Sequence, residues 1–159
     1  MRTTIAAAAV ALLVTACSGG SSAPAPSPSP TFSRGTVLID TDGDTVLLHS
    51  LFAQTPEQRS RGLTDARVLP EGWAMVFVFF HSTTAPVPKT AASIPLSVAL
   101  FDVDGRILEI FDVAACESTP CPVPDPGVAY MGAIATRQGL FEERGVTVGD
   151  VVHAVPGGE

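Results

Sequence analysis

The chain has 159 residues and a formal net charge of −7, with 9 Lys and Arg residues against 16 Asp and Glu residues. Nucleic acid and anionic lipid surfaces are bound by clustered basic side chains, so this composition argues against both as partners. The length leaves room for one domain of ordinary size once a non-globular start is set aside.

The first residues are typical of an export signal. Arg2 gives a charged start, residues 5–14 form an apolar run, and Val14-Thr15-Ala16-Cys17 follows. The run is shorter than the roughly 20 apolar residues of a membrane span. Small residues before a cysteine indicate a lipobox, so we expect residues 1–17 to be a lipoprotein signal peptide. An ordinary secretory signal with an incidental cysteine is the alternative.

Lipidation of Cys17 would decide where the protein works. Fatty acyl chains such as palmitate, attached to this cysteine, would hold the chain on the extracytoplasmic face of the cell membrane. Ser, Ala and Pro dominate residues 18–33, a composition that cannot bury enough apolar surface to fold. We expect a disordered tether there and a single β-rich domain over residues 34–159.

Short apolar runs separated by turn residues predict seven strands in that domain. They cover residues 36–40, 45–52, 74–80, 95–101, 106–112, 128–134 and 151–155. Asp42-Gly43 and Asp104-Gly105 each lie between two runs, which indicates hairpins because Gly accepts positive φ. Residues 73–80, WAMVFVFF, are continuously apolar, which predicts a strand buried on both faces or covered by a partner.

Two short helices complete the prediction. Thr55-Pro56-Glu57-Gln58 combines a hydroxyl cap, Pro at the first helical position and Gln three residues after the cap, so a helix should begin there and end near Gly62. A second is expected at about 137–144, before Gly145. The fold class is therefore mainly β, an antiparallel β-sandwich or partly closed barrel with two short helices.

One group of residues could suggest metal binding. Asp40-Thr41-Asp42-Gly43-Asp44 resembles the start of a calcium loop, but Leu51 occupies the position where a bidentate Glu is needed. The sequence also has no P-loop, no nucleotide-binding glycine pattern and no zinc-peptidase or nucleophile-elbow motif. We therefore predict a hairpin turn at these aspartates, no metal site and no cofactor.

The remaining cysteines form an even pair. Cys116 and Cys121 are separated by four residues, which is neither the usual zinc spacing nor the thioredoxin spacing. In an oxidising compartment we expect them to form a disulfide.

Several segments together resemble a known family, the domain of unknown function 192, over roughly residues 37–155. The segments that carry the resemblance are 55–59 with 61–63, the strand 75–79, Ile94-Pro95-Leu96, 102–107, Cys116 with 120–122, Tyr130, and 145–151. Members are similar to small exported or envelope-associated β-sandwich domains. The resemblance brings no reaction and no ligand.

The resemblance also points to a candidate site. Family members typically carry Phe-Trp-Met-Lys-Asn-Thr before the Ile-Pro-Leu, whereas this chain has residues 87–92, VPKTAA, so only a displaced lysine matches. The Glu that usually follows the Tyr is also absent. The candidate ligand-binding residues are Lys89, Thr90 and Tyr130, with the loop around Lys89 expected to be exposed.

Two functions stay open at this point. The first is a lipid-anchored extracytoplasmic module that binds an unknown envelope ligand or protein. The alternative is an envelope enzyme with a site near Lys89, to which Asp112 or Glu109 could contribute.

Overall fold

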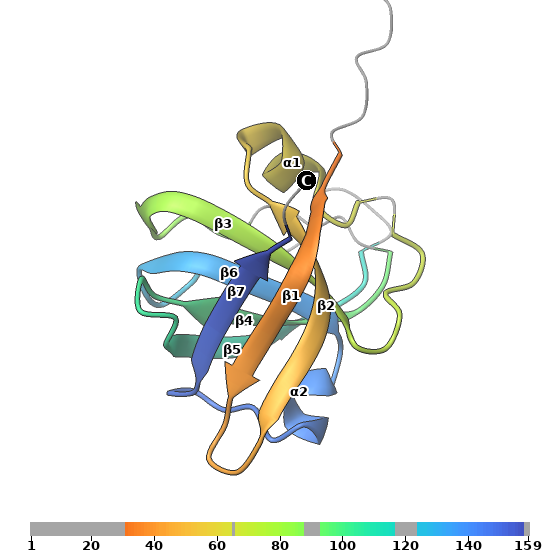
Figure 1. Ribbon diagram of the computed structural model, residues 1–159. Helices are drawn as coiled ribbons and strands as arrows, with labels where there is room; N and C mark the ends of the chain where they lie inside the picture. The colour runs from red at the N-terminus through yellow and green to blue at the C-terminus, as the bar shows by residue number, and fades with distance from the viewer. Residues whose placement is uncertain (1–30, 65, 88–92, 117–123, 158–159) are drawn as a thin grey trace, which may run out of the picture.

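The computed structural model describes residues 31–64, 66–87, 93–116 and 124–157, which form seven strands and two short helices (Figure 1). The elements are β1 (Ser33–Asp40), β2 (Thr45–Ala53), α1 (Pro56–Arg61), β3 (Trp73–Thr83), β4 (Leu96–Phe101), β5 (Ile107–Val113), β6 (Tyr130–Arg137), α2 (Leu140–Glu143) and β7 (Val151–Pro156). All seven predicted strands are confirmed, as is the mainly β fold with two short helices.

The strands form one sheet in the order β5-β4-β6-β3-β2-β1-β7. It is mixed rather than wholly antiparallel, because β2 and β3 run parallel, with Leu51 opposite Met75. Parallel neighbours need a connection that returns the chain to the same end of the sheet. Residues 54–72, which include α1, make that return, so the expectation of antiparallel pairing is corrected at this one pair.

The sheet is not closed, although it folds over on itself. Figure 1 shows β7, β1 and β2 crossing in front of β3, β6, β4 and β5. The edge strands β5 and β7 meet near one end, where an isolated bridge pairs Arg106 with Val151. Two backbone hydrogen bonds support it, from Ile107 N to Asp150 O (2.8 Å) and from Val152 N to Gly105 O (2.7 Å).

Apolar side chains fill both sides of the sheet. Val37, Phe52, Val76 and Ile134 form a core within the fold of the sheet, and Phe141 of α2 packs into it. A second core on the outer face contains Met75, Phe77, Leu96 and Tyr130, with Leu63, Leu69 and Val87 from the connecting segments above them. The continuous apolar run of β3 is thus buried on both faces over residues 74–77, as predicted.

The two helices begin where their caps allow. In α1 the Thr55 side chain accepts from Gln58 N and the Gln58 side chain accepts from Thr55 N, which confirms the predicted capping box. The second helix is shorter than predicted because β6 continues to Arg137 and Gly139 adopts a left-handed conformation (φ 84°) before α2. In the described part of the chain, neither helix has the length and apolar character to span a membrane.

The two Asp-Gly turns differ although their dipeptides are identical. Gly105 has a φ of +80°, and a Cβ there would lie 2.2 Å from Val152 O, at the contact between the sheet edges. Gly43 lacks a positive φ, and nothing lies within 4 Å of the position that its Cβ would occupy.

We predict that Gly105→Ala lowers the free energy of unfolding by about 2 kcal/mol or more, since a side chain there is both strained and obstructed. The matched change Gly43→Ala should alter the free energy of unfolding by less than about 1 kcal/mol. Denaturant unfolding of the two variants measures the difference. Similar midpoints for both would contradict the assigned role of the edge contact.

Candidate functional site

The predicted site residues divide between described and undescribed parts of the chain. Cys17, Lys89, Thr90 and Cys121 lie outside the described residues. Cys116 is described and half-buried at the end of the segment after β5, but its proposed partner is not, so the disulfide stays a prediction. Tyr130 is described in full.

Tyr130 is an anchoring residue at the start of β6. Its side chain is fully buried, and its hydroxyl donates a 2.8 Å hydrogen bond to the carbonyl of Ala85. Burial raises the pKa of the phenol to about 12, so the side chain stays neutral and able to donate. Ala85 lies four residues before Lys89. Tyr130 therefore fixes the position of Ala85, a described residue shortly before Lys89 in the sequence.

An irregular region of β3 faces this anchor. The pairing with β6 shifts from Val78 opposite Gly132 to Thr83 opposite Tyr130, so residues 79–82 bulge against Met131. The Phe79 ring meets the Tyr130 ring edge-on at 5.4 Å between centroids, while Phe80 is 75% exposed. Bulges commonly re-aim side chains beside functional sites.

Arg59 of α1 ties the helix to the bulge. Its guanidinium lies 4.9 Å from the centre of the Phe79 ring and donates to the carbonyls of Val78 (2.9 Å) and Gln54 (2.7 Å). Arg59 and Tyr130 both belong to segments that carry the family resemblance. The structure joins them through Phe79, a connection that sequence reasoning missed because all three residues lie far apart along the chain.

A surface cleft of about 560 Å³ lies where the segment before β4 meets the end of β6. It is lined by Val68, Leu69, Ile94, Pro95, Arg137 and Gln138. Ile94 and Pro95 come shortly after residues 88–92, where the resemblance places the site. Val68 is 72% exposed. The cleft thus combines apolar walls with two polar side chains from the end of β6.

The charge at this cleft is balanced. Arg137 donates from Nη1 to Glu143 Oε1 at 2.9 Å, and its Nη2 lies 4.0 Å from Glu71 Oε1. The hydrogen bonds to Glu143 raise the pKa of Arg137 above its usual value, so the guanidinium stays charged. A ligand would therefore meet a fixed donor whose charge is already neutralised by nearby carboxylates.

A polar cluster lies behind the cleft. Buried Ser97 donates to Asp112 Oδ1 at 2.6 Å and accepts from Gly139 N at 2.9 Å, while Gln138 donates to Asp112 Oδ2 at 2.8 Å. Glu109, the other acidic candidate, accepts a 3.1 Å hydrogen bond from Gly127 N. Both carboxylates thus hold neighbouring segments together.

The other candidates from the sequence occupy turns and strand surfaces. Asp44 closes the β1–β2 hairpin, where its carbonyl accepts from Thr41 N at 2.9 Å, in agreement with the predicted turn. His153 contacts Asp40 at 3.0 Å, and His49 lies against Trp73. Among residues 31–157, omitting the undescribed positions, no three His, Cys, Asp or Glu side chains converge as a metal site would require.

We predict that Tyr130→Phe lowers the free energy of unfolding by about 1 kcal/mol through loss of the hydrogen bond to Ala85. Because the pKa of the folded phenol lies above its ordinary value of 10.0, the stabilisation should be complete below pH 10. This stabilisation should be lost as the pH rises toward about 12, because the tyrosine of the unfolded chain ionises at a lower pH than the buried tyrosine of the folded chain.

Titration of the phenolate absorbance measures the pKa of Tyr130 directly, because the chain has one tyrosine. A midpoint near 12 is expected for the folded protein, and a midpoint near 10 would contradict the buried anchor.

Comparisons with known proteins agree with this fold. A protein from Sinorhizobium meliloti 1021 described as a candidate transcription regulator superposes with a TM-score of 0.70 at 23% identity, over 80% of this chain and 98% of the other. A protein of unknown function from Novosphingobium aromaticivorans DSM 12444 superposes with a TM-score of 0.64 at 19% identity, over 76% and 84% of the two chains. No curated protein matches the sequence. The family model described as "Uncharacterized ACR" matches residues 37–154, so the chain belongs to the DUF192 family.

Proposed function

We propose that this protein is a lipid-anchored, extracytoplasmic binding module whose ligand occupies the cleft formed by Val68, Leu69, Ile94, Pro95, Arg137 and Gln138. The observation that carries the proposal is the composition of this cleft, two of whose lining residues, Ile94 and Pro95, come shortly after residues 88–92 in the sequence. Ligand sites in proteins typically occupy about 300–1,000 Å³ and combine apolar walls with a few fixed polar groups. This cleft has both properties.

The geometry favours binding over the enzyme alternative. Asp112 and Glu109 accept hydrogen bonds from groups of the protein, which suits a structural role better than acid–base chemistry. Because Arg137 is already paired with Glu143, a ligand with an apolar part and neutral acceptors, such as carbonyl groups, suits the cleft better than a multivalent anion.

Nucleic acid is not part of the proposal. The description of the Sinorhizobium protein as a candidate regulator of transcription belongs to that protein. Here the net charge of −7 would repel a phosphate backbone.

The anchored location rests on the sequence around Cys17, which supplies the thiol for lipid attachment. We predict that Cys17→Ala abolishes incorporation of a fatty-acid analogue and leaves the protein unprocessed or released from the membrane, because the apolar run of residues 5–14 is too short to span it. Metabolic labelling followed by membrane fractionation measures both effects. Equal labelling of the variant and the wild type would refute lipidation at Cys17.

For the cleft, we predict that Val68→Asp weakens binding of an anilinonaphthalene sulfonate dye at least about tenfold, because a carboxylate on the apolar wall would need desolvation. Val148→Asp is the matched control, since Val148 is also exposed (60%) but does not line the cleft. Fluorescence titration gives both affinities. Equal weakening by the two variants would show that the dye does not report on this cleft.

A further inference from the structure

A groove follows the outer edge of β7, the last strand of the sheet (Figure 1). It has a volume of about 460 Å³ and two walls. One wall is residues 152–155 of β7, and the other is residues 101–105, which end β4 and turn toward β5. The groove shares no lining residue with the cleft proposed above, so the two sites can be tested separately.

Hydrogen bonds around β7 show which of its backbone groups face the groove. Val152 N donates to Gly105 O at 2.7 Å and so points away from β1. Further along, Gly157 N donates to Arg34 O at 2.7 Å and points toward β1. Backbone groups alternate between the two sides of a strand, and the register with β1 continues without a break. Ala154, two residues after Val152, therefore directs both its N–H and its C=O away from β1.

The pairing along this edge of β7 stops just before Ala154. Gly105 N turns back to donate to Asp102 O at 3.1 Å, and the Asp102 carboxylate accepts from Asp104 N at 2.9 Å. The turn therefore curls away from β7 instead of extending the pairing. In the described part of the chain, no hydrogen bond reaches Ala154 from the side of the groove. Unpaired groups on an exposed sheet edge are a template for another strand.

The charge of the groove is negative. Asp104 is exposed and Asp102 is partly exposed, and neither carboxylate forms an ion pair within the described ranges. The neighbouring Arg106 donates from Nη1 to a backbone carbonyl at 2.8 Å instead. His153 also lines the groove, but its ring contacts the Asp40 carboxylate at 3.0 Å. Two carboxylates thus remain to attract a cationic group.

We propose that this groove binds an extended peptide with basic side chains, which adds to the edge of β7 as a further strand. Its backbone would pair with the free N–H and C=O of Ala154, the way in which peptides extend exposed sheet edges. Its apolar side chains would contact Val103 and Val155, which are 76% and 56% exposed. Its cationic side chains would face Asp102 and Asp104.

A second copy of this chain fits the groove less well. Two-fold pairing through Ala154 would bring the acidic turns of both copies together, and like charges repel. The free edge is also short, because Val152 N is already bonded to Gly105 and Pro156 has no N–H. A short peptide of opposite charge meets both conditions.

The test titrates the full-length chain, purified in a non-ionic detergent, with the blocked peptide acetyl-Lys-Val-Lys-Val-Lys-amide in an isothermal titration calorimeter. We expect saturable binding that weakens as salt is added. The same peptide N-methylated at every residue keeps its charges but lacks main-chain donors, so it should bind at least about tenfold more weakly. A peptide with Glu in place of Lys should show no measurable binding.

Substitutions in the protein locate the site. Ala154→Pro removes the free N–H without breaking a bond to β1, so affinity should fall at least about tenfold while the melting temperature stays within about 5 °C of the wild type. Asp104→Asn should weaken binding about threefold at low salt. Asp42→Asn, an exposed aspartate of the β1–β2 hairpin, is the matched control and should bind like the wild type. Gln138→Ala changes the cleft and should leave peptide binding unaltered.

Four results would overturn the proposal: no saturable binding of the Lys peptide, equal binding of its N-methylated form, equal binding of the Glu peptide, or wild-type affinity in Ala154→Pro. If Ala154→Pro does not fold, the comparison of the two Lys peptides on the wild type decides the question. Sedimentation without peptide tests the other occupant. A dimer that Ala154→Pro abolishes would show that a second copy, and not a peptide, pairs with β7.

Discussion

The burial of β3 on both faces is the constraint on which the rest of the structure depends. β3 is the middle strand of the seven, and its residues 74–77 are apolar without alternation. A strand of this kind needs a cover on each face of the sheet. One cover is the core within the fold of the sheet, in which Val76 is buried together with Val37 and Phe52. The other is made by the connecting segments that carry Leu63, Leu69 and Val87.

This second cover explains why the candidate cleft lies where it does. A connecting segment that covers the sheet must itself contain apolar residues. Some of them, such as Val68 and Ile94, stay partly exposed at the margin of the core. Arg59, Phe79 and Tyr130 join α1, the bulge of β3 and the loop after Ala85 into one contiguous set of contacts. The segment that begins at Ala85 is thereby fixed to the sheet at its first residue, a form of support that binding sites generally need.

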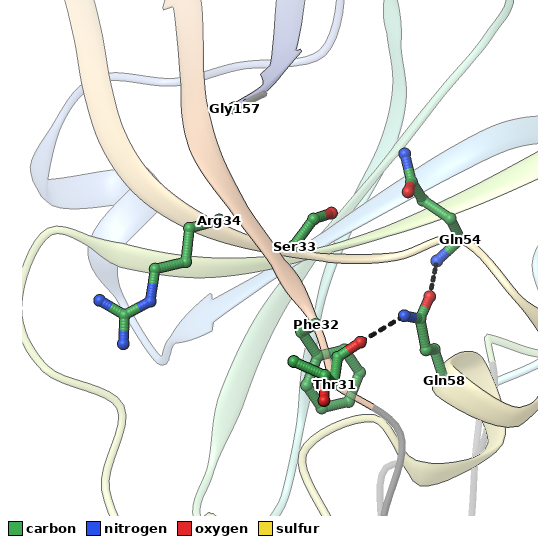
Figure 2. A pocket seen from close by; sticks show the side chains of 7 residues that line it. All are labelled: Thr31, Phe32, Ser33, Arg34, Gln54, Gln58 and Gly157. Atoms are coloured by element: carbon green, nitrogen blue, oxygen red, sulfur yellow. Dashed lines mark hydrogen bonds between the residues drawn. The ribbon is translucent and has the colours of Figure 1, made fainter. Parts of the chain in front are cut away.

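The folding over of the sheet has consequences at both of its ends. At one end, Gly105 lets the edge strands approach, and Phe141 of α2 fills the interior. At the other end, beside α1, a cavity of about 340 Å³ lies between the segment leading into β1, the end of β2 and the residue after β7 (Figure 2).

Much of the fold could be predicted from the sequence because its signals are local. Alternation of apolar and polar residues, turn dipeptides and a capping box depend on neighbours within a few positions, so the seven strands and α1 lie close to their predicted ranges. The family assignment followed from the order of short segments. The export signal and the cysteine pair are likewise local patterns, and they stay predictions.

Tertiary structure decided what depends on distant residues. Asp42-Gly43 and Asp104-Gly105 look alike in sequence, and only the approach of Val152 makes Gly105 irreplaceable. Tyr130 was predicted as a ligand-binding residue, whereas its contact with Ala85, 45 residues earlier, makes it a buried anchor. The cleft combines Val68 and Leu69 with Arg137 and Gln138, which lie far apart in the sequence. No local pattern encodes such cavities, because their walls form only when a curved sheet brings its ends and connections together.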